Sequence, residues 1–298
     1  MKHDPPTYEG RPLARPEEEV VDQGLGFDLR TLASRRQLLR AFGLGATVLG
    51  LAACATDRDT STSGTSATST ASGEIPDETA GPYPGDGSNG PDVLQQSGIV
   101  RGDIRTSFGT GNATAEGVPM TLELTITDMA NGSTPFAGTA VYVWHCDREG
   151  RYSLYSDDIK DQNYLRGVQI ADSAGKVRFT SIFPACYSGR WPHIHFEVYP
   201  DQAGIADAAK AIATSQVALP KDTCTTVYGQ SGYEQSISNL SRVSLQSDNV
   251  FGDDGAAHQL GTVTGTVDSG LTVTLAVPVD TRTKPSGGGA PPAGPGGR

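Results

Sequence analysis

Alternation of apolar and polar residues dominates the middle of this 298-residue chain. Several stretches alternate with a period of two, the spacing at which successive side chains point to opposite faces of a β-strand. These stretches are residues 120–128, 140–146, 177–183 and 194–199. Residues 261–279 have the form of a hairpin with its turn at 267–270. Strands at this spacing, separated by turns, predict an all-β fold: a single β-sandwich of the immunoglobulin or transthyretin kind with long loops.

Helical periodicity is weak, and only residues 204–214 and 233–240 predict short helices. The ends of the chain differ in composition from its middle. Residues 55–73 are rich in Ser, Thr and Gly, which is typical of a flexible tether, and the Gly/Pro-rich tail is expected to be disordered. The predicted organisation is a signal segment at 1–54, a tether at 55–73, the sandwich domain at 74–282 and a tail at 283–298.

The first 54 residues carry the pattern of an export signal. Arg35 and Arg36 precede an apolar run at 41–53, which has the size of a signal-peptide core and is short for a membrane span. The run ends in Leu-Ala-Ala-Cys54, which looks like a lipobox whose cysteine is acylated. We therefore expect export by the twin-arginine route and a lipid anchor at Cys54 on the outer face of the cytoplasmic membrane. The alternative is a plain signal peptide with an incidental cysteine.

Charge and composition narrow the class of protein. The net charge is −11 and the isoelectric point about 4.8, so no basic surface is available for nucleic acid. Glycine occurs 37 times and proline 19 times, and charged residues make up only 19% of the chain. This composition favours an all-β body with many turns over a helical protein.

Candidate chemistry concentrates between Tyr187 and His195. His193 and His195 are separated by one residue in an alternating run, so both imidazoles lie on one face of a strand and can hold one metal ion. Tyr187 lies six positions before His193 and can reach the same point through a Ser-Gly turn, and Tyr152 offers a second phenol. Two imidazoles and two phenolates suit a hard trivalent cation better than zinc. The residues therefore predict ferric iron.

With the motifs around them, these residues resemble the intradiol ring-cleavage dioxygenases, the family of catechol 1,2- and protocatechuate 3,4-dioxygenases. In particular, the chain resembles the exported single-chain branch found in actinobacteria. The motifs run in family order over residues 75–280. They are Asp-Glu-Thr-Ala-Gly-Pro-Tyr at 77–83, Gly-Ile-Val-Arg-Gly at 98–102, Val-Tyr-Val-Trp-His-Cys-Asp at 141–147, Gly-Arg-Tyr-Ser at 150–153, Tyr-Leu-Arg-Gly at 164–167 and the segment 187–195.

The resemblance implies an enzyme that uses Fe(3+) to insert O2 between the two hydroxyl-bearing carbons of a small catechol, giving a cis,cis-muconate-type product. It implies that iron is held by Tyr152, Tyr187, His193 and His195. Of these, Tyr187 would leave the metal when substrate binds.

The resemblance assigns three further residues. Arg190 would stabilise the activated ring, Gln216 would lie near the oxygen site, and Tyr83 would line the substrate cleft. The alternatives are a surface ion pair for Arg190, an edge-strand polar residue for Gln216 and an exposed turn aromatic for Tyr83.

The pairing of the cysteines is not fixed by the sequence. An exported chain permits a disulfide, and we expect one between Cys186 and Cys224, with Cys146 as a buried thiol; the other pairings of these three remain open. One rival function is a lipid-anchored, non-catalytic β-sandwich that binds aromatics or sugars. The other is a zinc or copper site built from His193, His195, His145 and Cys146. The binding module does not need Tyr152 and Tyr187 together with Arg190, and a copper site would want Cys146 exposed to the metal.

Overall fold

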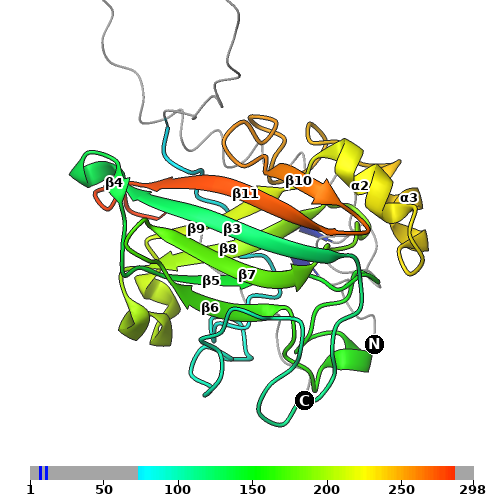
Figure 1. Cartoon of the computed structure of the whole chain (residues 1–298), viewed down its shortest axis with the longest axis horizontal. Helices are drawn as coiled ribbons and strands as arrows, with labels where there is room; N and C mark the ends of the chain where they lie inside the picture. Colours follow the sequence, from blue (N-terminus) through cyan, green and yellow to red (C-terminus); the bar gives the residue numbers. More distant parts are fainter. Residues whose placement is uncertain (1–6, 9–10, 13–72, 286–298) are drawn as a thin grey trace, which may run out of the picture. The chain divides into compact units, whose positions relative to one another are not determined.

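The computed structural model describes residues 7–8, 11–12 and 73–285. The chain separates into two units, Met1–Thr70 and Ala71–Arg298. The first contributes a hairpin of β1 (Thr7–Tyr8) and β2 (Arg11–Pro12), and the second holds a two-sheet β fold (Figure 1). The predicted signal segment around Arg35 and Arg36, Cys54, the tether up to residue 72 and the tail from residue 286 lie outside the described residues.

The second unit is built from two sheets of mainly antiparallel strands. The first sheet has the order β10–β11–β3–β4, and β7 also pairs with β3. Its strands are β3 (Pro119–Asp128), β4 (Thr134–Pro135), β7 (Lys176–Ile182), β10 (Thr262–Thr266) and β11 (Gly270–Val279). The second sheet has the order β6–β5–β8–β9, with β5 (Ala140–Trp144), β6 (Arg166–Ile170), β8 (His193–Tyr199) and β9 (Ala213–Ala218). Among the described strands, only β11 and β3 pair in parallel.

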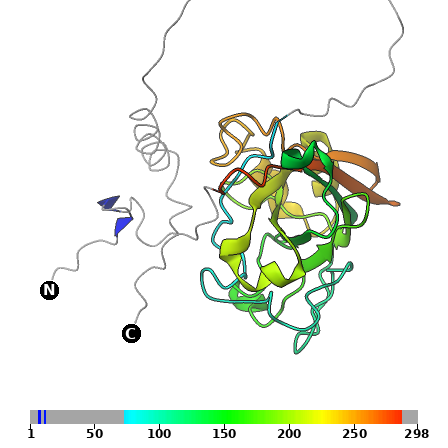
Figure 2. The same ribbon diagram turned by 90° about the vertical axis from the view of Figure 1, so that its left-hand side faces the viewer.

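A shared apolar core joins the two sheets. Leu122 and Phe179 enter it from the first sheet, and Ile194 and Phe196 enter it from the second. Because side chains alternate along β8, His193 and the other odd-numbered residues face the opposite side of the second sheet. Every residue of β8 is nevertheless buried, since apolar residues from the loops before β3 and after β5 cover that outer face. Figure 2 shows the segment before β3 (cyan) along one side of the fold.

The predicted all-β sandwich is confirmed, as are the four alternating strands and the hairpin at 261–279. The helix predicted at 233–240 occurs as α3 (Glu234–Leu240), and α2 (Lys221–Tyr228) was not predicted. Within the described residues, no helix has the length and apolar character needed to cross a membrane.

The helix predicted at 204–214 is wrong. Two 3₁₀ turns, η4 (Gln202–Ala206) and η5 (Ala208–Lys210), take its place, and the chain then enters β9. The side chains of Asp201 and Asp207 accept hydrogen bonds from the backbone N–H groups of Gly204 and Ala209. These local bonds start a new turn twice and prevent a continuous helix.

Candidate metal centre

Three possible metal-donor atoms meet on the outer face of β8. The Nε2 atoms of His193 and His195 are 3.0 Å apart, and Tyr187 Oη lies 3.2 Å from His193 Nε2. His193 Nδ1 is 2.5 Å from the carbonyl oxygen of Trp191, and because a carbonyl only accepts, Nδ1 carries the proton. The Nε2 lone pair is therefore directed into the cluster, which is the tautomer that a metal ligand requires.

Tyr152 lies beside these three groups. Its ring is edge-on to Tyr187 and to His195, with centroid separations of 5.9 Å and 6.3 Å. The side chain is only 2% exposed, yet its hydroxyl makes no hydrogen bond of normal geometry with any described residue. A buried polar group without a partner costs about 1–3 kcal/mol. A cation at the point where the four side chains meet would supply that missing partner.

Burial keeps all four groups uncharged when no cation is bound. It raises the pKa of Tyr187 to about 12, although Arg190 opposes the effect, and it raises the pKa of Tyr152 well above its usual value. Burial also lowers the pKa of His193 to about 3 and that of His195 well below its ordinary range. A trivalent cation with two phenolates and one hydroxide would carry no net charge, so its burial would be tolerable. The donor set fits ferric iron.

Two neighbours fix the His195 ring. Trp144 stacks on it with ring centroids 4.8 Å apart and an interplanar angle of 7°. Gly81 approaches so closely that a Cβ atom there would lie 3.3 Å from His195 Cε1, and its φ of +72° is one that a side chain would disfavour. The glycine of the 77–83 motif therefore permits the close contact between this loop and a candidate ligand.

Tyr83, the predicted substrate residue, lies next to the same centre. Its ring centroid is 4.9 Å from that of Tyr152 and 5.1 Å from that of Tyr155. Arg166 donates a 2.9 Å hydrogen bond to the Tyr83 carbonyl and another to the carbonyl of Ser153, which adjoins Tyr152. The loop that carries Tyr83 and the loop that carries Tyr152 are thus tied together. This packing distinguishes Tyr83 from an isolated exposed aromatic.

Arg190 lies just before β8 and Gln216 lies within β9, and the two side chains meet. Gln216 lies opposite His195 in the register of β8 and β9, and its Oε1 accepts a 2.7 Å hydrogen bond from Arg190 Nη2. Its Nε2 donates to the Thr79 carbonyl, so both ends of the amide are engaged. Gln216 is fully buried and Arg190 is 12% exposed, which disfavours the surface alternatives for both residues.

Asp248 is a site residue that the sequence pattern did not single out. Its Oδ2 accepts hydrogen bonds from Arg190 Nε at 3.0 Å and from the Trp191 N–H at 2.6 Å. Its Oδ1 accepts from the N–H groups of Val250 and Phe251 at 2.9 and 3.1 Å. Burial alone would raise the pKa of Asp248, but Arg190 and the hydrogen-bond donors hold it below its ordinary value. The carboxylate is therefore charged and fixes the turn before His193.

His145 and Cys146 do not join the candidate centre. His145 Nδ1 lies 2.8 Å from the Cys146 carbonyl, and its Nε2 lies 2.8 Å from Ser181 Oγ. The Cys146 thiol faces the Ala185 carbonyl. In the part of the chain that the structure describes, no three His, Cys, Asp or Glu side chains are placed to hold a metal together. The zinc or copper alternative would need His145 and Cys146 beside His193 and His195, and both residues have other partners.

The disulfide predicted between Cys186 and Cys224 is not formed in the structure. Cys146, Cys186 and Cys224 are all buried free thiols. Cys186 Sγ lies 3.5 Å from the Arg190 carbonyl, whereas Cys224 Sγ lies 3.9 Å from the Leu219 carbonyl. Burial raises the pKa of the Cys186 thiol to about 12 and also raises that of Cys224. Each thiol stays protonated and is directed at a separate backbone carbonyl.

Comparisons with known proteins agree with this geometry. Residues 89–204 match the family model described as dioxygenase. A chlorocatechol 1,2-dioxygenase of Rhodococcus opacus is 39% identical over 54 residues, which are 18% of this chain and 21% of that relative. The chain is thus similar to intradiol ring-cleavage dioxygenases, as its motifs predicted. The match spans only about a fifth of the curated relative.

Solved structures share the fold. An intradiol ring-cleavage dioxygenase from Tetranychus urticae aligns with a TM-score of 0.57 and 23% identity, over 71% of this chain and 96% of that one. A second dioxygenase structure aligns with a TM-score of 0.55 and 22% identity over the same shares. The family match contains the four candidate ligands, whereas Tyr83, Gln216 and Asp248 lie outside it.

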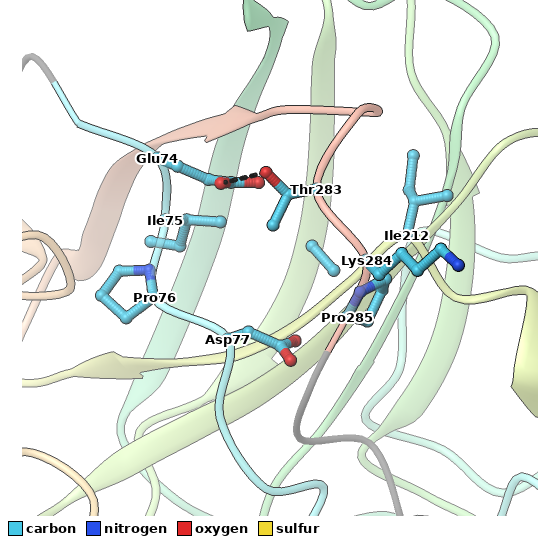
Figure 3. Close-up of a pocket in the computed structure, with 9 residues that line it drawn as sticks. Glu74, Ile75, Pro76, Asp77, Ile212, Thr283, Lys284 and Pro285 are labelled. Atoms are coloured by element: carbon cyan, nitrogen blue, oxygen red, sulfur yellow. Dashed lines mark hydrogen bonds between the residues drawn. The ribbon is translucent and has the colours of Figure 1, made fainter. Parts of the chain in front are cut away.

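A separate pocket of about 230 Å³ lies where residues 74–77 meet residues 283–285 (Figure 3). Thr283 donates a hydrogen bond of 2.9 Å to Glu74 across its rim, and Ile212 and Ala213 complete the lining. None of the predicted site residues lines this pocket. It is therefore distinct from the candidate metal centre.

Proposed function

We propose that this chain is a non-heme iron(III)-dependent intradiol dioxygenase that inserts O2 between the two hydroxyl-bearing carbons of a catechol, giving a cis,cis-muconate-type product. The observation that carries the proposal is the meeting of Tyr187 Oη with the Nε2 atoms of His193 and His195. The unpartnered hydroxyl of Tyr152 beside them adds a fourth donor. Phenolate and imidazole donors favour a hard trivalent ion. The relative from Rhodococcus opacus, a chlorocatechol 1,2-dioxygenase, supports a catechol as substrate.

Ferric iron, when bound, would draw electron density from a coordinated catechol ring and make a ring carbon reactive towards O2. Tyr187 is placed to receive a substrate proton at Oη, because this atom lies at the point where the candidate donors meet, 3.2 Å from His193 Nε2, and a phenolate is a base. Tyr152 is packed between Tyr83 and Tyr187 and is suited to remain a permanent ligand.

Arg190 would stabilise negative charge on the substrate ring. Its guanidinium is buried beside the centre, held by Gln216 and Asp248, and stays charged at any physiological pH. A fixed charge in a site shielded from water stabilises a developing anion more effectively than a mobile one in solution. The aromatic rings of Tyr83, Tyr152 and Tyr155 would exclude water from one side of that site.

The experiment that tests the proposal combines metal content, colour and oxygen uptake. The purified protein should contain one iron per chain, show the red-brown colour of ferric tyrosinate and consume O2 with at least one member of a catechol panel. His195→Ala should abolish iron content and colour. His258→Ala is a matched control, because His258 has no part in the centre. A colourless protein with stoichiometric zinc would overturn the proposal, and catechol binding without O2 uptake would favour the non-catalytic binding module.

We also propose that the enzyme acts outside the cytoplasm, as a twin-arginine-exported lipoprotein of the single-chain actinobacterial branch. Support comes from Arg35 and Arg36, the apolar run at 41–53 and the Leu-Ala-Ala-Cys54 sequence. The twin-arginine route carries folded proteins, so iron could be inserted before export.

A further inference from the structure

The carboxylate of Asp248 is the centre of a hydrogen-bond network that joins Arg190 to the backbone N–H groups of Trp191, Val250 and Phe251. We infer that Asp248 is a positioning residue that aims the Arg190 guanidinium at the bound substrate. The inference rests on the proposed function, in which Arg190 stabilises charge on the substrate ring. It adds a residue that lies 58 positions from Arg190 in the sequence and outside the family match.

Arg190 donates hydrogen bonds to the protein through two of its three guanidinium nitrogens. Its Nε and Nη2 donate to Asp248 at 3.0 and 3.4 Å, and Nη2 also donates to Gln216 at 2.7 Å. Its Nη1 makes no hydrogen bond with the described residues. Because the guanidinium is planar and rigid, fixing two of its nitrogens also fixes the direction of the third. Asp248 and Gln216 therefore leave one charged N–H₂ group available to a ligand.

The side chains of Arg190 and Asp248 are both shielded from solvent. Arg190 is 12% exposed and Asp248 is fully buried, so each charge depends on the other for compensation. The carboxylate is held in turn by the N–H groups of Trp191, Val250 and Phe251, so it cannot swing away from the guanidinium. The pair is thus oriented before any substrate arrives. Such preorganisation makes a charge effective in catalysis.

Asp248 is also connected to the candidate ligand His193 through the backbone of Trp191. Asp248 accepts from the Trp191 N–H, and the Trp191 carbonyl accepts from His193 Nδ1. Phe251 directly follows Val250. Its ring centroid lies 6.0 Å from the Arg190 guanidinium and 6.5 Å from the ring centroid of His193. A purely structural role for Asp248, as the cap of this loop, would disturb His193 as much as Arg190. The test must separate these two roles.

Asp248→Asn is the informative variant, because it keeps the shape of the side chain and removes its charge. Asp253→Asn is the matched control, since Asp253 is an exposed acid of the same loop. In the iron-loaded protein, Asp248→Asn should keep iron content and the tyrosinate absorption band while kcat falls by about 10²-fold. Asp253→Asn should keep the parent's kcat. Loss of the iron band in Asp248→Asn would mean that Asp248 supports the ligands instead, which would overturn the inference.

A double-mutant cycle with Arg190→Lys tests whether Asp248 acts through Arg190. If it does, the losses of kcat will not multiply, and Asp248→Asn will cost less than about threefold in the Arg190→Lys background. Fully multiplicative losses would overturn the inference.

A second readout needs neither iron nor turnover. In metal-free protein labelled with ¹⁵N, the Arg190 Nε–H should exchange slowly with solvent, because it is buried and bonded to Asp248. Arg190→Lys identifies its resonance, which should be lost to fast exchange in Asp248→Asn and retained in Asp253→Asn. An unchanged resonance in Asp248→Asn would contradict the inference. A parent protein that consumes no O2 would contradict the proposed function, whereas an active parent with an unaffected Asp248→Asn variant would contradict only the role of Asp248.

Discussion

Replacement of Arg166 should destabilise the fold more than any exposed arginine of the domain. Its side chain is 1% exposed, and none of its hydrogen-bond partners is a carboxylate. The guanidinium makes five hydrogen bonds, to Ser153 Oγ, Ser153 O, Tyr83 O, Pro84 O and Tyr142 Oη. Arg166 thereby joins β6, the loop that carries Tyr83 and the loop that carries Tyr152. Arg166→Leu keeps part of the side-chain volume and removes every one of these bonds.

The size of the effect follows from what the partners lose. The Pro84 carbonyl keeps a donor in Tyr142 Oη at 2.6 Å, but the carbonyls of Tyr83 and Ser153 lose the donor that Arg166 supplies. Each buried acceptor left unpaired costs about 1–3 kcal/mol. Relief from burying a cation offsets part of this cost. We therefore expect Arg166→Leu to lower the free energy of unfolding by roughly 2–4 kcal/mol, from two unpaired carbonyls less the relief from burying a cation.

Urea denaturation of metal-free protein measures this loss without a contribution from iron binding. Arg105→Leu is the control, because the ion pair of Arg105 with Asp103 joins side chains that are 41% and 51% exposed. Exposed pairs contribute about 0–1 kcal/mol. Arg166→Lys should fall between the two, since it keeps the charge and loses the planar fork. A loss below about 1 kcal/mol for Arg166→Leu would refute the idea that this network holds the two loops.

Three further perturbations have defined outcomes. Gly81→Ala places a Cβ 3.3 Å from His195 Cε1 at a φ of +72°. It should lower the free energy of unfolding by about 1–2 kcal/mol and weaken iron binding in a chelator competition. An iron affinity equal to that of the parent would contradict this expectation. The pKa of Glu78 is raised to about 8 by burial and then by Asp253, so its contribution is fully present below pH 4.5 and is lost as the pH rises through 8. Glu78→Gln should remove that decline in stability, and identical pH slopes for parent and variant would contradict the assignment. Cys54→Ala should move the protein out of the membrane fraction of an actinobacterial host, and a variant that stays membrane-bound would exclude the lipid anchor.

The cluster of candidate ligands could be predicted because its geometry is largely local. His193 and His195 share a strand, and period-two alternation places them on one face in any sheet that contains that strand. Tyr187 is six residues away through one turn, so its approach to His193 depends on few backbone angles. Tyr152 needed more than spacing, because it comes from another loop. Its place beside His195 was inferred from the family resemblance.

The strands that were not predicted show where pattern fails. β9 reads Ala-Thr-Ser-Gln-Val-Ala, and all six of its residues are buried although half are polar. Gln216 and Ser215 are acceptable inside because other side chains meet their hydrogen-bonding groups. β6 begins with the buried Arg166 and includes a glycine, both unusual in an isolated strand. Hydrophobic periodicity cannot detect a strand whose polar groups are satisfied by partners far along the chain.

Asp248 marks the limit of sequence reasoning for this site. It lies in Gln-Ser-Asp-Asn-Val, a polar loop sequence with no periodicity, and two other acids nearby in the chain, Asp253 and Asp254, are exposed. Only tertiary closure of the loop over Arg190 makes this carboxylate different, through desolvation and through donors from two segments. In a buried ion pair each charge compensates the other, and burying either residue alone would be unfavourable. The orientation of the Arg190 guanidinium therefore could not be predicted without Asp248, whose carboxylate compensates its charge. The sequence indicated only that Arg190 lies three residues before His193.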